Sequence, residues 1–115
     1  MLSGQSDKAQ SLGQHAVDLA RMYKERGNEA YALRLLAEVA SRRERPGVDV
    51  ADELFRQALA LANNLGMKPL VASCHGGLAH LFRRMGRSER AQEEWNAANE
   101  LLLELGTPAQ ARRPE

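Results

Sequence analysis

Leucine and alanine recur at intervals of three and four residues through most of the chain, which is the spacing of amphipathic α-helices. β-Branched residues are few, and none alternates with polar residues over a useful length, so the pattern does not indicate strands. Glycine and proline interrupt the pattern around residues 27–28, 45–47, 66–69, 86–88 and 106–108. The sequence therefore predicts an all-α fold of five helices, each of about 16–18 residues.

Residues at these interruptions are of the kinds that begin and end helices. Ser88 can cap the last helix through its hydroxyl. Gly66 and Gly106 follow the stretches NNL and LEL and are expected to stop the helices there, as glycines at C-terminal helix ends do. We expect residues 1–106 to form a single helical domain and residues 107–115, TPAQARRPE, to form a flexible tail.

The third and fifth predicted helices carry the same order of small and large residues. Three positions match at a distance of 40 residues: Ala51 with Ala91, Phe55 with Trp95, and Ala58 with Ala98. The first helix extends the series 42 residues earlier, through Ala9, Gly13 and Ala16. The first, third and fifth helices are therefore of one type and the second and fourth of another, which indicates a helical repeat.

The fourth and fifth predicted helices together resemble one tetratricopeptide (TPR) repeat, whose pattern is W-x2-L-G-x2-Y, then A-x3-F, then P. The matching residues are His75, Leu78, Ala79 and Phe82, followed by Ala91, Trp95 and Ala98. The second helix fits less well, through Ala32, Leu35, Leu36 and Val39. The resemblance covers nearly the whole chain, which looks like the extended TPR arrays found as tails of bacterial multidomain signalling proteins, including cyclase- and ATPase-type regulators. It implies a right-handed α-solenoid of five antiparallel helices, about two and a half repeats.

A second assignment of the repeat, with Ala16, Leu19, Ala20 and Tyr23 as the first-helix residues, also fits the pattern. We reject this assignment because the two helix types must alternate along the chain. It would make the fourth helix the second helix of a repeat, although the fourth helix carries the better match to the first-helix pattern. The preferred assignment pairs the second helix with the third and the fourth with the fifth.

Composition excludes several classes of protein. Hydrophobic residues make up 43% and charged residues 27% of the 115 residues, as in ordinary globular proteins. The formal net charge of +1 provides no global attraction for nucleic acid or membrane. No segment approaches the roughly 20 apolar residues of a membrane helix. The single cysteine and the absence of a signal-peptide pattern at the N-terminus lead us to expect a cytoplasmic protein.

The residue types needed for metal binding or catalysis do not stand at suitable spacings. Cys74 and His75 precede His80 by six and five residues, whereas ligands on one face of a helix are three or four residues apart. Ser73 is adjacent to Cys74, and neighbouring positions on a helix point apart, so no nucleophile and base face each other. We therefore expect no metal, no cofactor and no enzymatic activity.

Two adjacent glycines, Gly76 and Gly77, lie inside the fourth predicted helix, where each costs roughly 1 kcal/mol relative to alanine. They either let a neighbouring helix pack closely or leave room for a ligand, and we favour packing. The TPR resemblance places them in a concave groove formed by residues 28–43 and 69–85. The expected groove residues are Arg34, Ala37, Ser41, Ser73, Gly76, Gly77, His80 and Arg84. The resemblance thus implies a non-catalytic protein–protein interaction module that binds an unidentified protein or peptide in this groove.

Arginines gather near the ends of the second and fourth predicted helices and could form a basic rim. The rim residues are Arg42, Arg43, Arg83 and Arg87. An acidic peptide or a phosphate backbone is an alternative partner for this rim. Nucleic acid is disfavoured because aromatic residues for base stacking are lacking and Glu44 and Glu89 dilute the charge.

Three apolar residues of the fifth predicted helix, Ala97, Leu101 and Leu103, fall outside the stripe that should face the fourth helix. No further repeat follows to cover them, and exposed apolar patches often mark interfaces. We expect this helix to form a two-fold homodimer. A second alternative function is therefore a self-associating regulatory domain of a larger signalling protein.

Overall fold

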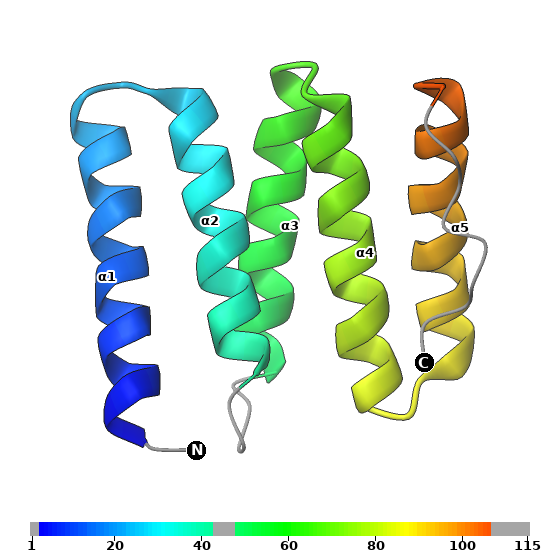
Figure 1. Ribbon diagram of the computed structural model, residues 1–115, viewed down its shortest axis with the longest axis horizontal. Helices are drawn as coiled ribbons and strands as arrows, with labels where there is room; N and C mark the ends of the chain where they lie inside the picture. Colours follow the sequence, from blue (N-terminus) through cyan, green and yellow to red (C-terminus); the bar gives the residue numbers. More distant parts are fainter. Residues whose placement is uncertain (1–2, 43–47, 107–115) are drawn as a thin grey trace.

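The computed structural model describes residues 3–42 and 48–106, and these form five α-helices that lie side by side in chain order (Figure 1). The helices are α1 Ser3–Met22, α2 Arg26–Ser41, α3 Val48–Asn64, α4 Lys68–Arg84 and α5 Ser88–Glu104. Consecutive helices run in opposite directions, and the described residues contain no strand. The all-α prediction with five helices is confirmed. The predicted tail, residues 107–115, lies outside the described residues.

The packing of neighbouring helices is consistent with a helical repeat. The most extensive contacts join α2 to α3 and α4 to α5, the pairs that the preferred repeat assignment predicts. The contacts of α1 with α2 and of α3 with α4 are smaller, and α2 also contacts α4 directly. None of the helices in the described ranges is both long enough and apolar enough to cross a membrane.

Burial repeats along the chain with the same period as the sequence. Residues 51–60 of α3 and residues 91–100 of α5 show the same order of buried, half-buried and exposed positions. Phe55 and Trp95 are the large members of the two sets and are 1% and 7% exposed. The alanines around them allow the helices to approach closely, while the aromatic rings fill the space between them.

The predicted first-helix pattern of α2 is wrong by about one residue. Leu35 was expected to pack inward but is 50% exposed, and Val39 is only half-buried. The buried positions are instead Leu33, Leu36, Ala37 and Ala40, which stand 42 residues before His75, Leu78, Ala79 and Phe82. Equivalent positions of α2 and α4 are thus 42 residues apart, whereas those of α3 and α5 are 40 residues apart. The difference arises because the connection from α2 to α3 is longer than that from α4 to α5.

Glycines in the left-handed region follow three of the helices. Gly66, Gly86 and Gly106 have φ angles of 71°, 78° and 77°. This conformation turns the chain so that the amide of the next residue can donate to a free carbonyl in the last turn of the helix. After α3, for example, the Met67 amide donates to the carbonyl of Ala62 at 2.9 Å. The expected cap at Ser88 is wrong, because Ser88 is the first helical residue and the preceding arginine stands at the cap position without a side-chain bond.

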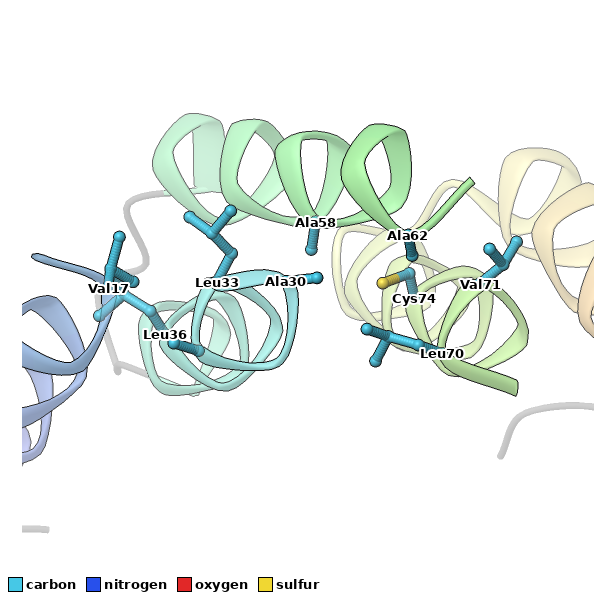
Figure 2. Close-up of a cluster of buried hydrophobic side chains, with 10 residues drawn as sticks. Val17, Ala30, Leu33, Leu36, Ala58, Ala62, Leu70, Val71 and Cys74 are labelled. Carbon is cyan, nitrogen blue, oxygen red and sulfur yellow. The ribbon is translucent and has the colours of Figure 1, made fainter. Parts of the chain in front are cut away.

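Two clusters of buried side chains make up the core. The first links α1 to α4 and is shown in Figure 2, where Val17, Leu33 and Leu36 lie on one side and Leu70, Val71 and Cys74 on the other. The second lies around Phe55 and Phe82, which pack with Leu78, Leu81 and alanines of α2, α3 and α5. No polar or charged residue is fully buried among the described residues, so apolar packing makes up the core between the helices.

Candidate partner-binding groove

A hollow of about 290 Å³ opens on the exposed side of α4, between α5 and the edge of α2. Its lining includes the predicted groove residues Ser73, Gly76, Gly77 and His80. Three residues of α5 that were not predicted as groove residues form the opposite wall: Trp95, Ala98 and Leu102. The sequence had placed the groove between α2 and α4, but α2 contributes only Glu38.

The two adjacent glycines of α4 have different surroundings. A Cβ atom added to Gly77 would lie 2.6 Å from Cζ of the buried Phe55 and closer still to Cε1. A Cβ atom added to Gly76 would meet nothing within 4 Å. Gly77 therefore serves the close approach of α3 and α4, as the packing interpretation predicts, whereas Gly76 leaves open space in the hollow.

The α5 wall of the hollow is aromatic. The Trp95 ring meets the ring of His80 edge to face, with centroids 5.9 Å apart and an interplanar angle of 74°. Although Trp95 is only 7% exposed, its indole Nε1 has no acceptor among the described residues. Buried indole N–H groups usually have a partner, so this nitrogen, which is itself covered by protein, is an exception.

The α2 side of the predicted groove is mostly committed to internal contacts. Arg34 forms an ion pair with Glu38, with Nη1 2.6 Å from Oε2. Ala37 is 0% exposed and lies in the core, so its prediction as a partner-contacting residue is wrong. The cause is the one-residue shift of α2, which turns Ala37 inward.

Ser41 and Arg84 join α2 to α4 at one end of the groove. The Ser41 hydroxyl donates to the carbonyl of Glu38 at 2.8 Å, and the Arg84 guanidinium donates to the carbonyl of Ser41. Arg84 therefore satisfies a carbonyl at the C-terminal end of α2, where backbone acceptors lack helical partners. Arg84 is nevertheless exposed, so its role as a groove residue stays a prediction.

The contact between Arg84 and Ser41 also places the predicted rim residues at the same end of α2 and α4. The side chains of Arg42, Arg83 and Arg87 are exposed there, whereas that of Arg43 lies outside the described residues. Next to them, the guanidinium of Arg90 stacks 4.5 Å from the ring centroid of Phe82. Arg90 is not one of the rim residues, and its contact joins α5 to α4 beside the rim.

His75 and Cys74 are used in packing. His75 Nδ1 lies 2.7 Å from Glu94 Oε1 across the α4–α5 interface, and both side chains are mostly buried. Cys74 is fully buried, and this burial raises the pKa of its thiol to about 11, against a lowering effect of Arg34. A neutral thiol is a poor nucleophile and metal ligand. In the described ranges, no group of three or more His, Cys, Asp or Glu residues is placed to hold a metal ion.

The three residues expected to mediate self-association do not form one exposed patch. Leu103 is 63% exposed. Ala97 is half-buried, and Leu101 is half-buried against the first core cluster. Leu101 stands 40 residues after Leu61, and both pack against this cluster. The prediction that Leu101 points outward was therefore wrong. This position of the repeat faces the neighbouring first-type helix.

Comparison with protein-family models, with curated proteins and with solved structures yields no match for this chain. The likeness to TPR repeats therefore rests on the residue pattern alone, while the helix pairing and the repeated burial of α3 and α5 are consistent with a helical repeat.

Proposed function

We propose that the chain is a non-catalytic protein-interaction module whose partner binds in the hollow between α4 and α5. The observation that carries this proposal is the shape of the hollow, which is lined mainly by small and apolar residues beside the ring of Trp95. Aromatic residues in concave, largely dry surfaces are the usual anchors of protein interfaces. Small residues at the base of such a surface let a partner's backbone come close.

The TPR resemblance supports the same function, because TPR arrays present their first-type helices to partners. The exposed face of α4 in the hollow, with Ser73 and His80, belongs to such a helix. We further propose a right-handed solenoid and a role in a cytoplasmic signalling assembly, in keeping with the resemblance and with the single reduced cysteine.

Site-specific photo-crosslinking tests this function. A benzoylphenylalanine introduced at Ser73, in the hollow, should trap the partner in cells, whereas the same residue at the exposed Ala60 of α3 should not. Gly76→Phe should abolish the Ser73 crosslink by filling the hollow, because Gly76 lines it and a Cβ at this position meets no atom within 4 Å. Equal crosslinking at both positions, or no effect of Gly76→Phe, would exclude the hollow as the binding site.

Self-association is a second candidate function, favoured by the apolar surface that α5 exposes near its C-terminal end. Leu103 and Leu105 are 63% and 40% exposed there. Because Leu101 packs inward, the proposed dimer contact is smaller than the sequence predicted and centres on Leu103.

A further inference from the structure

Most of the large apolar side chains that the described residues expose lie on α1 and α2. Nine such side chains are exposed, and six of them belong to these two adjacent helices. The six are Leu12, Leu19, Met22, Tyr23, Tyr31 and Leu35. Leu12 and Tyr23 are 62% and 67% exposed, so no other part of the described fold covers them. Apolar side chains gathered in this way on a surface often mark an interface.

The exposed residues of the two helices lie on one face of the α1–α2 pair. On α1, Leu12 directly precedes Gly13. On α2, Leu35 directly precedes Leu36, and a Cβ on Gly13 would lie 2.9 Å from Cδ1 of this Leu36. One residue turns about 100° around a helix. Because the two helices are right-handed and antiparallel, the same backward step from their contact leads to the same face of the pair (Figure 1).

Three further couples of residues follow this rule, with an exposed residue directly before a buried one. The couples are Ala16 with Val17, Leu19 with Ala20, and Tyr31 with Ala32. Tyr23 continues the row on α1, one turn after Leu19. We call the resulting surface the α1–α2 face, and its members are Leu12, Ala16, Leu19 and Tyr23 of α1 with Tyr31 and Leu35 of α2.

Two contacts between α1 and α2 show which of their residues are level along the helix axes. The contacts are that of Gly13 with Leu36 and that of Arg21 with Glu29, whose Nε and Oε2 atoms are 2.8 Å apart. Counting from these contacts, Val17 of α1 is level with Leu33 of α2. This level is the middle of the α1–α2 face on both helices.

The α1–α2 face is symmetric about its middle. On α1, its members are spaced by four, three and four residues, so the row has the same spacing from either end. On α2, Tyr31 and Leu35 each stand two residues from Leu33. A half-turn about an axis at this level, perpendicular to the helices and lying in the face, therefore lays each row antiparallel on its own copy.

We infer that two copies of this chain pair through the α1–α2 face, with α1 on α1 and α2 on α2 of the second copy. Every member of the face then meets an apolar residue. The opposed residues are Leu12 with Tyr23, Ala16 with Leu19, and Tyr31 with Leu35. A two-fold dimer is also the commonest closed assembly of identical chains. This inference goes beyond partner binding in the hollow and does not depend on it.

The size of the α1–α2 face suits a dimer of moderate strength. Two adjacent helices, each about 10 Å wide and about 25 Å long, present roughly 500 Å² in projection. A standard interface buries about 800 Å² of accessible surface on each partner, and the accessible surface of side chains exceeds their projected area. The C-terminal end of α5 exposes only Leu103 and Leu105, so the α1–α2 face is the larger self-association surface.

Sedimentation velocity on matched variants tests the pairing. Leu12 and Leu103 are 62% and 63% exposed, so a glutamate at either site removes the same kind of side chain from one of the two surfaces. We expect a concentration-dependent dimer that Leu12→Glu weakens at least tenfold and Leu103→Glu leaves unchanged. A chain that stays monomeric at high micromolar concentration, or a dimer lost with Leu103→Glu and kept with Leu12→Glu, would overturn the inference.

A charge exchange tests the antiparallel arrangement. Leu12→Glu and Tyr23→Lys should each weaken the dimer, whereas the chain with both substitutions should regain at least tenfold in affinity, because the new charges are opposed across the two-fold axis. The two sites are about 16 Å apart along α1, so they cannot pair within one chain. Both are exposed, and circular dichroism confirms that the variants fold. Absence of the rescue would refute the proposed arrangement.

Cysteine crosslinking gives a second measurement. A short bismaleimide should join two Ala16→Cys chains, whose thiols lie near the symmetry axis, and should not join two Ala60→Cys chains, altered on the exposed side of α3. Cys74 is fully buried and does not compete. Equal yields from the two variants would contradict the inference. The product has twice the mass of the chain, whereas the Ser73 photo-crosslink traps a different protein, so the two proposals fail separately.

Discussion

Alanine at Gly77 and alanine at Gly76 should change stability in opposite directions. Both substitutions replace a glycine in the interior of α4, so each gains about 1 kcal/mol of helix propensity. Only Gly77 faces a crowded site, where the added methyl would lie 2.6 Å from Phe55 Cζ. The ring is 1% exposed and is enclosed by the second core cluster, so it cannot swing into solvent.

The magnitude follows from the difference between the two variants. Overpacking in a filled core costs typically 1–3 kcal/mol, which is the expected gap between Gly77→Ala and Gly76→Ala because the propensity gain cancels. We expect Gly76→Ala to be about 1 kcal/mol more stable than wild type and Gly77→Ala about 1 kcal/mol less stable. For a domain of this size, each of these changes corresponds to about 4 °C in melting temperature.

Urea unfolding followed by circular dichroism at a helix band measures both changes. The m-value should stay constant, since neither variant alters the surface exposed on unfolding by much. Phe55→Leu serves as the control background: without the ring, the penalty of Gly77→Ala should shrink, which a double-mutant cycle quantifies. If Gly77→Ala is as stable as Gly76→Ala, the close approach of α3 to α4 described here is wrong.

Three further predictions follow from individual contacts. Burial raises the pKa of the folded Cys74 thiol to about 11, whereas an unfolded thiol has a pKa near 9.0. The free energy of unfolding should therefore fall as pH rises between these values. Cys74→Ala should flatten this part of a plot of the urea midpoint against pH. Arg84→Ala should lower the free energy of unfolding by about 0.5–1 kcal/mol, because the hydrogen bond to the Ser41 carbonyl of α2 is lost. The control is Arg87→Ala, which removes an exposed arginine at the same end of the fold and should leave the free energy of unfolding unchanged. Urea titration measures both. Leu101→Glu should destabilise the fold by about 2 kcal/mol, whereas Leu103→Glu should change stability by less than about 0.5 kcal/mol and abolish any dimer that forms through α5 in sedimentation.

The helices and their pairing could be predicted from the sequence because they depend on local signals. The three-and-four spacing of apolar residues specifies helices, and glycines at positions such as Gly66 and Gly106 mark their ends through positive φ angles. The 40-residue match of Phe55 with Trp95 likewise predicted that the two lie in equivalent packing positions. Such signals need no knowledge of which helix lies opposite.

The rotation of α2 about its axis could not be predicted in the same way. Leucines at 33, 35 and 36, together with Tyr31 and Val39, spread apolar residues around much of the helix, so no narrow stripe defines the inward face. Burial of Leu33 rather than Leu35 depends on where α1, α3 and α4 lie against α2. The wrong placement of Ala37 in the groove followed from this ambiguity.

The properties of the candidate site depend on contacts between residues distant in sequence. Gly76 and Gly77 are equivalent in a propensity argument, but they point about 100° apart around the helix, and only the position of Phe55 on α3 makes one crowded and the other open. The hollow beside Trp95 is lined by residues of α2, α4 and α5 that are far apart in the sequence. The sequence by itself determined which segments are helical and which helices pair, since these follow from the backbone and from residue spacing. Only the tertiary structure decided which side chains remain accessible, since accessibility depends on the helices that pack around them.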